Sequence, residues 1–115
     1  MTKSSSPSSR SFEKRLQVLR RQIDLADARL LKALAKRAHI IEQIAVLKMQ
    51  EQAPIRQKSR WEKLLQNRLG LAKKLKVDIQ LVKDIFKIIQ IESIERQAKV
   101  MKKNSNGRRF KGSAK

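Results

Sequence analysis

Residues 16–48 read LQVLRRQIDLADARLLKALAKRAHIIEQIAVLK and contain neither Gly nor Pro. Two columns of residues spaced seven apart run through this segment, and together they alternate four and three apart, as the apolar stripe of a packed helix does. The columns are Leu16, Ile23, Leu30, Arg37 and Ile44, and Arg20, Asp27, Leu34, Ile41 and Lys48. The pattern predicts one very long first helix, from near Phe12 to near Gln50, with a length of about 57 Å.

Four charged residues lie inside this otherwise apolar stripe: Arg20, Asp27, Arg37 and Lys48. An unpaired buried cation costs several kcal/mol, so the stripe needs protein carboxylates or an anionic ligand against it. Arg37 and Lys48 would lie about 16 Å apart along the helix and could reach one small ligand, whereas Arg20 is about 42 Å from Lys48. A second, antiparallel copy of the helix would supply its own Arg20. We therefore predict an intertwined C2 homodimer with two sites.

The remainder of the sequence favours an all-α fold with three helices per chain. The chain contains 3 Gly, 2 Pro and no Tyr, and it lacks the β-branched and aromatic runs of a sheet. Pro54 disfavours helix at the residue before it, which ends the first helix. Ser59 and Glu62 have the spacing of a capping box, so we expect a second helix to begin at Ser59.

A third helix is expected over residues 79–100, after an N-cap at Asp78, and the second should end near Leu75. One face of the third helix carries three apolar residues followed by two polar ones: Val82, Phe86, Ile89, Ser93 and Gln97. One interpretation is that this helix leaves the core near Ser93. The other is that Ser93 and Gln97 face a polar ligand.

Arg60 is expected in the first turn of the second helix. Together with the polar positions in these stripes, it would line a cavity with arginines, a lysine, a serine and a glutamine. Arginine forks bind carboxylates in bidentate geometry, so the predicted ligand is a small dianion. This set contains no His, no Cys and no obvious general base. It therefore predicts chemistry by positioning and electrostatics, without a proton transfer or a covalent intermediate.

Several kinds of site and location are disfavoured by composition. The absence of Cys excludes disulfides and thiolate metal sites, and His39, the single histidine, cannot form a metal site alone. No apolar run reaches the roughly 18 residues of a membrane span. The Ser-rich residues 1–11 lack the apolar core of a secretory signal. We expect a cytoplasmic protein with no metal and no cofactor.

The charge is strongly positive, at +19, with a pI near 11.3. Residues 99–115 hold seven Lys or Arg and no acid. Composition predicts a disordered N-terminus over residues 1–11, a helical domain over residues 12–100 and a disordered basic tail over residues 101–115. The tail could bind RNA or another polyanion nonspecifically, which makes a nucleic-acid-binding protein a second hypothesis. Alternatively, it only keeps the protein soluble.

The order and spacing of the polar and apolar positions match those of a known family. The matching residues are Leu19-Arg20, Ile23-Asp24, Asp27, Leu30-Leu31, Arg37, Ile44-Ala45, Lys48, Pro54-Ile55 and Arg60, then Val82, Ile85-Phe86, Ile88-Ile89, Ser93 and Gln97. On these positions, residues 16–98 resemble the all-helical chorismate mutases, the AroQ class. The resemblance implies an intertwined homodimer of three-helix chains.

The resemblance also implies an activity and roles for residues. Such an isomerase converts chorismate to prephenate in the shikimate pathway, by an intramolecular Claisen rearrangement without a cofactor, for aromatic amino-acid biosynthesis. Three arginines would clamp the two substrate carboxylates: Arg37, Arg60 and the partner subunit's Arg20. Ser93 would help to bind one carboxylate. Lys48 and Gln97 would donate hydrogen bonds to the ether oxygen, where negative charge grows as the C–O bond breaks.

The sequence departs from the family pattern at two positions. Gln57 and Trp61 stand where many members carry carboxylates that bind the ring hydroxyl of chorismate. Gln57 can still accept a hydrogen bond, but Trp61 can only donate one. One interpretation is reduced mutase activity with Trp61 packed beside the ligand. Others are an altered substrate, as in an isochorismate pyruvate lyase or an aminodeoxychorismate mutase, and a weakly active or regulatory helical dimer.

Overall fold

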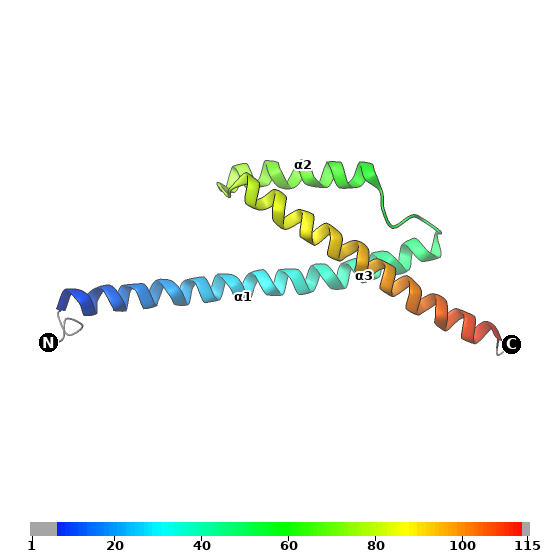
Figure 1. Cartoon of the computed structure of the whole chain (residues 1–115), viewed down its shortest axis with the longest axis horizontal. Coiled ribbons are helices and arrows are strands. Elements are labelled where there is room, and N and C mark those ends of the chain that lie inside the picture. The colour runs from blue at the N-terminus through cyan, green and yellow to red at the C-terminus, as the bar shows by residue number, and fades with distance from the viewer. Residues whose placement is uncertain (1–6, 114–115) are drawn as a thin grey trace. The chain divides into compact units, whose positions relative to one another are not determined.

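The computed structural model describes residues 7–113, with side chains described for residues 9–104, and this part of the chain is all-helical. It contains three helices: α1 (Pro7–Gln50), α2 (Lys58–Leu75) and α3 (Ile79–Ser113), as Figure 1 shows. The chain divides into two units, of which the first ends at Arg37 and the second begins at Ala38. The prediction of an all-α chain with one very long first helix is confirmed.

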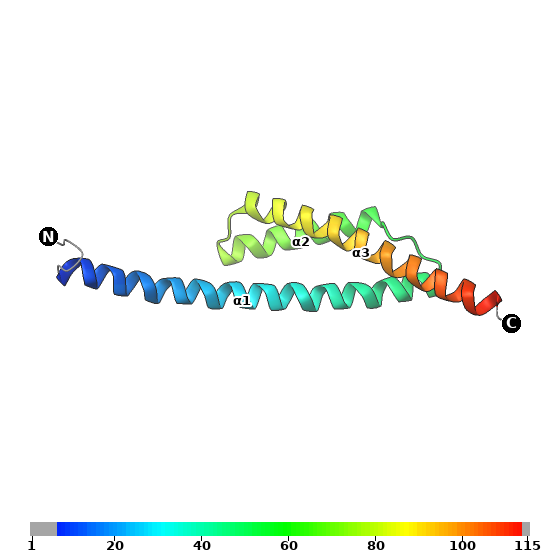
Figure 2. The same ribbon diagram turned by 60° about the horizontal axis from the view of Figure 1, so that its bottom comes forward.

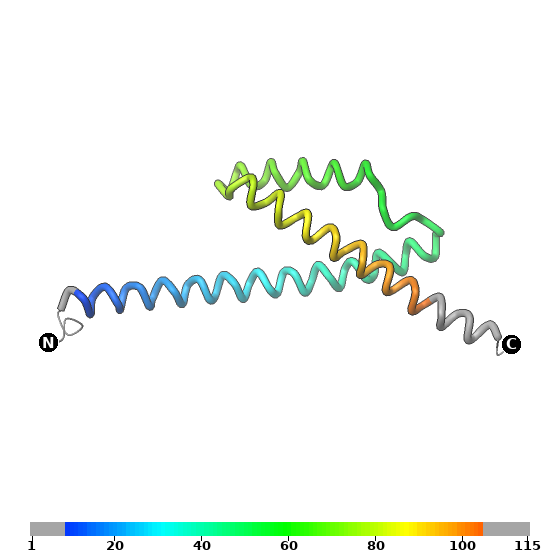
Figure 3. Tube along the Cα trace, in the orientation of Figure 1, coloured from blue at the N-terminus to red at the C-terminus, as the bar shows by residue number. Residues whose placement is uncertain are grey.

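Helix α1 begins earlier than predicted and ends where predicted. Its first residue is Pro7 rather than Phe12. Proline favours the first helical position, because its missing N–H would have no partner there and its φ already suits a helix. After Gln50 the chain turns through Gln52, which has a left-handed φ of 55°, and the backbone N–H of Ala53 donates to the carbonyl of Lys48 at 2.8 Å. Figure 3 traces the irregular connection that follows, through Pro54, to α2.

Helix α2 does not begin with the predicted capping box. It starts at Lys58, and Gln57 is the N-cap, with an extended backbone (φ −128°, ψ 100°) and no side-chain capping hydrogen bond. Ser59 therefore lies inside the helix, where it cannot act as the N-cap. At the other end α2 stops at Leu75, as predicted, and Lys76 takes the left-handed conformation that commonly closes a helix.

Helix α3 begins at Ile79 as predicted. The Asp78 carboxylate accepts a hydrogen bond from the backbone N–H of Leu81 at 2.8 Å, which confirms Asp78 as the N-cap. The helix continues to Ser113, past the end predicted at Val100. Its continuation is rich in Lys and Arg, which are good helix formers, and contains no Pro. Helix thus occupies residues 101–113 of the predicted disordered tail. Residues 1–6 and 114–115, for which disorder was also predicted, lie outside the described residues.

Helices α2 and α3 form a hairpin in the second unit and lie side by side (Figures 1 and 2). The small core of this unit contains Ala45, Leu64 and Ala72, which are buried. The guanidinium of Arg68 on α2 lies 5.8 Å from the ring centroid of Phe86 on α3, within reach of a cation–π contact. None of the helices, over the described residues, is both long and apolar enough to cross a membrane.

The apolar stripe of α1 is largely exposed in the single chain. Ile23 and Leu30 are each 57% exposed, and Leu34 is 38% exposed. Full burial of one such side chain is worth about 1.5–3 kcal/mol, so the single chain leaves most of this stabilisation unused. The exposed stripe is the surface that the predicted second copy would cover.

Candidate active site

Lys48, in the last turn of α1, is the centre of a polar group formed by three parts of the second unit. Its Nζ donates one hydrogen bond to Gln97 Oε1 on α3 at 3.0 Å and another to the backbone carbonyl of Ile55 at 2.8 Å. Ile55 belongs to the connection between α1 and α2. Because an ammonium group has three N–H donors, these contacts orient Lys48 and leave one N–H for a ligand.

Arg60, in the first turn of α2, adds a second positive charge near this group. Burial of the Lys48 side chain lowers its pKa from the ordinary 10.5, and the positive charge of Arg60 lowers that pKa further. Among the residues that the structure describes, no carboxylate lies within ion-pair distance of Lys48 or Arg60. Two neighbouring cations without a carboxylate favour an anion between them, as the sequence predicted for this site.

Ser93 and Gln97 lie one turn apart on α3 and face the interior. They are only 3% and 5% exposed. The interpretation that the third helix leaves the core near Ser93 is therefore wrong. No buried side-chain N or O atom among the described residues lacks a hydrogen-bond partner, so this polar interior is satisfied. The Gln97 amide turns its oxygen toward Lys48, and its NH₂ group keeps donors for a ligand.

Arg20 and Arg37 belong to the first unit, whereas Lys48, Arg60 and Gln97 belong to the second. Arg37 is partly buried, and Arg20 is exposed on α1. Their predicted roles in carboxylate binding stay predictions.

The two positions that depart from the family pattern flank the start of α2. Gln57 is the exposed N-cap residue, and its carbonyl accepts the hydrogen bond of the Trp61 backbone N–H at 3.1 Å. The Trp61 side chain is partly buried. It follows Arg60 directly, and adjacent helical residues point about 100° apart.

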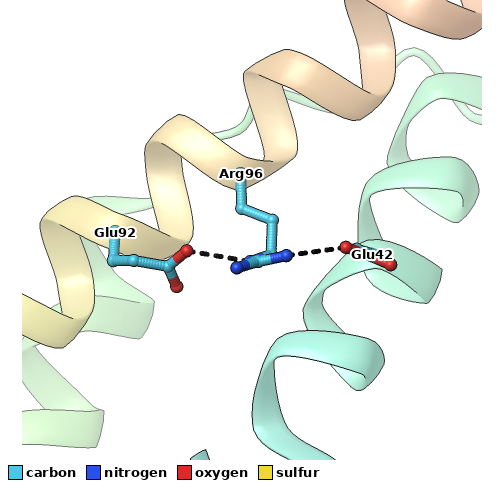
Figure 4. A network of polar contacts seen from close by, with 3 residues as sticks. All are labelled: Glu42, Glu92 and Arg96. Carbon is cyan, nitrogen blue, oxygen red and sulfur yellow. Dashed lines mark hydrogen bonds and ion pairs between the residues drawn. The ribbon is translucent and has the colours of Figure 1, made fainter. Parts of the chain in front are cut away.

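One interaction in this unit was missed by the sequence reasoning. Arg96 on α3 donates through Nη1 to Glu42 on α1 at 2.7 Å and through Nε to Glu92 at 2.8 Å (Figure 4). The spacing of Glu92 and Arg96, four apart on one helix, was a signal for part of this network. Glu42 lies far away in the sequence, and its pairing carried no comparable signal.

The arrangement can hold an anion and stabilise negative charge. The Lys48 ammonium and the Gln97 amide are held next to each other, and preorganised donors of this kind can stabilise an oxygen that becomes negative in a transition state. These three residues, Lys48, Arg60 and Gln97, include no group suited to accept a proton near neutral pH.

Comparison with known proteins identifies the family. The sequence model of the family "Chorismate mutase type II" matches residues 19–98. The chain is 32% identical over 91 residues to a bifunctional chorismate mutase/prephenate dehydratase of Buchnera aphidicola subsp. Acyrthosiphon pisum. It is 31% identical over 91 residues to the protein of the same name from Enterobacter agglomerans. Each match covers 79% of this chain and 24% of the relative, so the chain spans about a quarter of the length of these relatives. The resemblance drawn from the sequence is confirmed: the chain belongs to the chorismate mutase type II family.

Proposed function

We propose that this protein is a chorismate mutase, an isomerase that rearranges chorismate to prephenate. The observation that carries the proposal is the Lys48 ammonium, which is held by Gln97 and the Ile55 carbonyl, with the charge of Arg60 close by, in a chain of this family. The reaction breaks a C–O bond and forms a C–C bond within one molecule, so no proton needs to be moved. The geometry suits this, because the residues supply charge and direction.

The mechanism has two parts. Arg37, Arg60 and the partner subunit's Arg20 bind the two carboxylates and hold the flexible substrate in the compact conformation that reacts, with Ser93 assisting at one carboxylate. Such positioning can supply several kcal/mol of the barrier reduction. Lys48 and the Gln97 amide then donate to the ether oxygen as it gains negative charge. A donor in this role typically contributes about 100-fold to 1,000-fold in kcat.

The proposed active form is an intertwined homodimer in the cytoplasm that feeds aromatic amino-acid biosynthesis. The exposed apolar stripe of α1 supports the dimer, since a partner helix would bury Ile23, Leu30 and Leu34. In the dimer, Arg20 of one protomer serves the site that contains Lys48 of its partner.

Subunit complementation tests this shared site. Arg20→Ala and Lys48→Ala proteins are each expected to lose turnover while they remain dimers in analytical ultracentrifugation. When the two variants are unfolded together and refolded, half of the dimers should be mixed, with one intact site of two. About a quarter of the wild-type activity should therefore return. A site built from one chain would give no recovery on mixing.

The activity itself is tested by chorismate consumption by the purified protein, with the products resolved by chromatography. Prephenate is the expected product. Trp61 and Gln57 support a second candidate, in which the protein acts on isochorismate or aminodeoxychorismate, or eliminates pyruvate. Both substrates should be offered in the same assay. A wild-type protein that converts none of the three substrates and does not bind a chorismate transition-state analogue in calorimetry would be a regulatory dimer with an idle pocket.

The high positive charge supports a separate, nonspecific role for the C-terminal segment. Lys99, Lys102 and Lys103 lie on α3 with no acid after them in the sequence. We propose that residues 99–115 bind a polyanion such as RNA. Binding should weaken steeply with salt, by about 0.7–0.9 log units per phosphate contact for each tenfold rise in salt. Deletion of residues 101–115 should abolish most of this binding and leave turnover unchanged.

A further inference from the structure

Two polar contacts join the second-unit part of α1 to α3. One is the ion pair between Glu42 and Arg96, and the other is the hydrogen bond between Lys48 and Gln97. Arg96 and Gln97 are neighbours on α3, while Glu42 and Lys48 are six residues, or about 9 Å, apart along α1. Ala45, midway between them, is fully buried. Two contacts at separate points on α1 restrict both the rotation and the sliding of α3.

The guanidinium of Arg96 is itself held in place. Its Nε donates to Glu92 Oε2 at 2.8 Å, one turn earlier on α3, and its Nη1 donates to Glu42 Oε2 at 2.7 Å on α1 (Figure 4). Because a guanidinium is planar, a carboxylate that fixes the Nε side also directs the Nη1 side. Glu92 thus aims Arg96 at Glu42.

Arg96 and Gln97 are expected to move together. The two residues are consecutive on a rigid helix, so a rotation of α3 that separates Arg96 from Glu42 also moves the Gln97 side chain. The hydrogen bond from Lys48 Nζ to Gln97 Oε1, at 3.0 Å, has little tolerance, since such bonds are lost by about 3.6 Å.

We propose that Arg96 is a positioning residue, which acts through its ion pair with Glu42 to hold the Gln97 amide against Lys48. Its expected effect on the rate rests on the proposed mutase function, whereas its effect on the Lys48–Gln97 pair does not. Gln97 and Lys48 stabilise charge that develops in the transition state. Loss of the ion pair should therefore lower kcat while the KM for chorismate changes little.

Two isosteric variants distinguish the Glu42–Arg96 ion pair, which bridges α1 and α3, from the Glu92–Arg96 ion pair within α3. Glu42→Gln removes the carboxylate on α1 and leaves Arg96 with Glu92. Its kcat should fall between about 5-fold and 100-fold, the range expected for misplacement of a reacting group by up to about 1 Å. Glu92→Gln is the matched control, because it removes the same charge and leaves the bridge to Glu42. Its kcat should fall less. Equal falls in the two variants, or a Glu42→Gln enzyme with wild-type kcat, would overturn the proposal.

A charge exchange tests whether the bridge itself is what matters. In a Glu92→Gln background, Glu42→Arg and Arg96→Glu should each lower kcat when introduced singly. The two together restore an ion pair across the same helices, and kcat should recover to within about 3-fold of the background. An exchanged protein no more active than the weaker single variant would contradict the positioning role.

A readout without turnover keeps this inference separate from the proposed activity. The side-chain amide of Gln97, assigned by the loss of its NMR signals in Gln97→Met, reports on the hydrogen bond from Lys48. Its signals should shift in Glu42→Gln and stay near the wild-type values in Glu92→Gln. If the wild-type protein leaves chorismate unchanged and these shifts appear, the positioning role stands and the mutase assignment fails. Unshifted signals with only a lower melting temperature would make Arg96 a purely structural residue.

Discussion

Replacement of Lys48 by methionine is the most informative single perturbation of the candidate site. Methionine keeps much of the length and apolar stem of lysine but has no charge and no donor. The variant removes the hydrogen bonds to Gln97 Oε1 and to the Ile55 carbonyl, at 3.0 Å and 2.8 Å. It also removes the donor proposed for the ether oxygen of the substrate.

The change in stability should be small compared with the change in rate. Gln97 is 5% exposed, so its oxygen would be left without a partner, at a cost of about 1–3 kcal/mol. Part of this cost is offset, because the variant also relieves the burial of an ammonium group and its repulsion from Arg60, the two causes that lower the pKa of Lys48. In contrast, loss of a transition-state donor should lower kcat by about 100-fold to 1,000-fold.

Both quantities can be measured on the same protein. Unfolding in urea gives the stability, and chorismate consumption below and above KM gives kcat and KM. Lys32→Met is the matched control, because Lys32 is an exposed lysine on the same helix. Its kcat should equal that of the wild type. A Lys48→Met enzyme within about 2-fold of the wild-type kcat, with its fold intact, would refute the assignment of Lys48 as the donor.

Four further results are expected. The folded chain holds the pKa of Lys48 below the ordinary 10.5 of the unfolded chain, so between these two pKa values the folded state binds fewer protons than the unfolded state. The free energy of unfolding should therefore rise with pH in that window. Turnover should fall over the same window, because Lys48 loses its proton. Arg60→Gln should raise the pKa of Lys48, measured by NMR of labelled lysine, and an unchanged value would show that the charge of Arg60 has no influence there. Trp61→Glu should raise kcat/KM for chorismate by about 5-fold to 150-fold if the ring hydroxyl lacks a partner, and a fall would indicate that Trp61 contacts the ligand favourably. Ala45→Leu should lower the free energy of unfolding in urea by about 1–3 kcal/mol, because Ala45 is fully buried. Ala35→Leu, at an exposed position of the same helix, should not lower it. Equal effects of the two substitutions would contradict the packing at Ala45.

The sequence predicted the features that depend on local chemistry. Pro54 marks the break after α1, and Asp78 caps α3 with its carboxylate, because both act within a few residues of their own position. The polar pair Ser93 and Gln97 stood out because their spacing continues an apolar stripe, and the structure buries both. Helical periodicity alone was therefore enough to direct attention to the interior of the site.

The errors and omissions have physical causes as well. The spacing of Ser59 and Glu62 fits a capping box, but the helix begins at Lys58, and its N-cap is Gln57, two residues before Ser59. Helix ends depend on small differences in free energy, and three good helix formers, Met101, Lys102 and Lys103, follow Val100 and favour the extension of α3. The pairing of Arg96 with Glu42 joins residues 54 apart in the chain, and only the folded arrangement reveals it.

Lys48 holds the connection between α1 and α2 at two places. Its backbone carbonyl accepts from Ala53 N–H, and its ammonium donates to the Ile55 carbonyl two residues further along. The same residue therefore anchors the segment that leads to Arg60 through both its backbone and its side chain. A bound anion that draws the ammonium away from Ile55 would release one of these anchors. Amide hydrogen exchange at Ala53 would then report, in the dynamics of the connection, whether the ligand site is occupied.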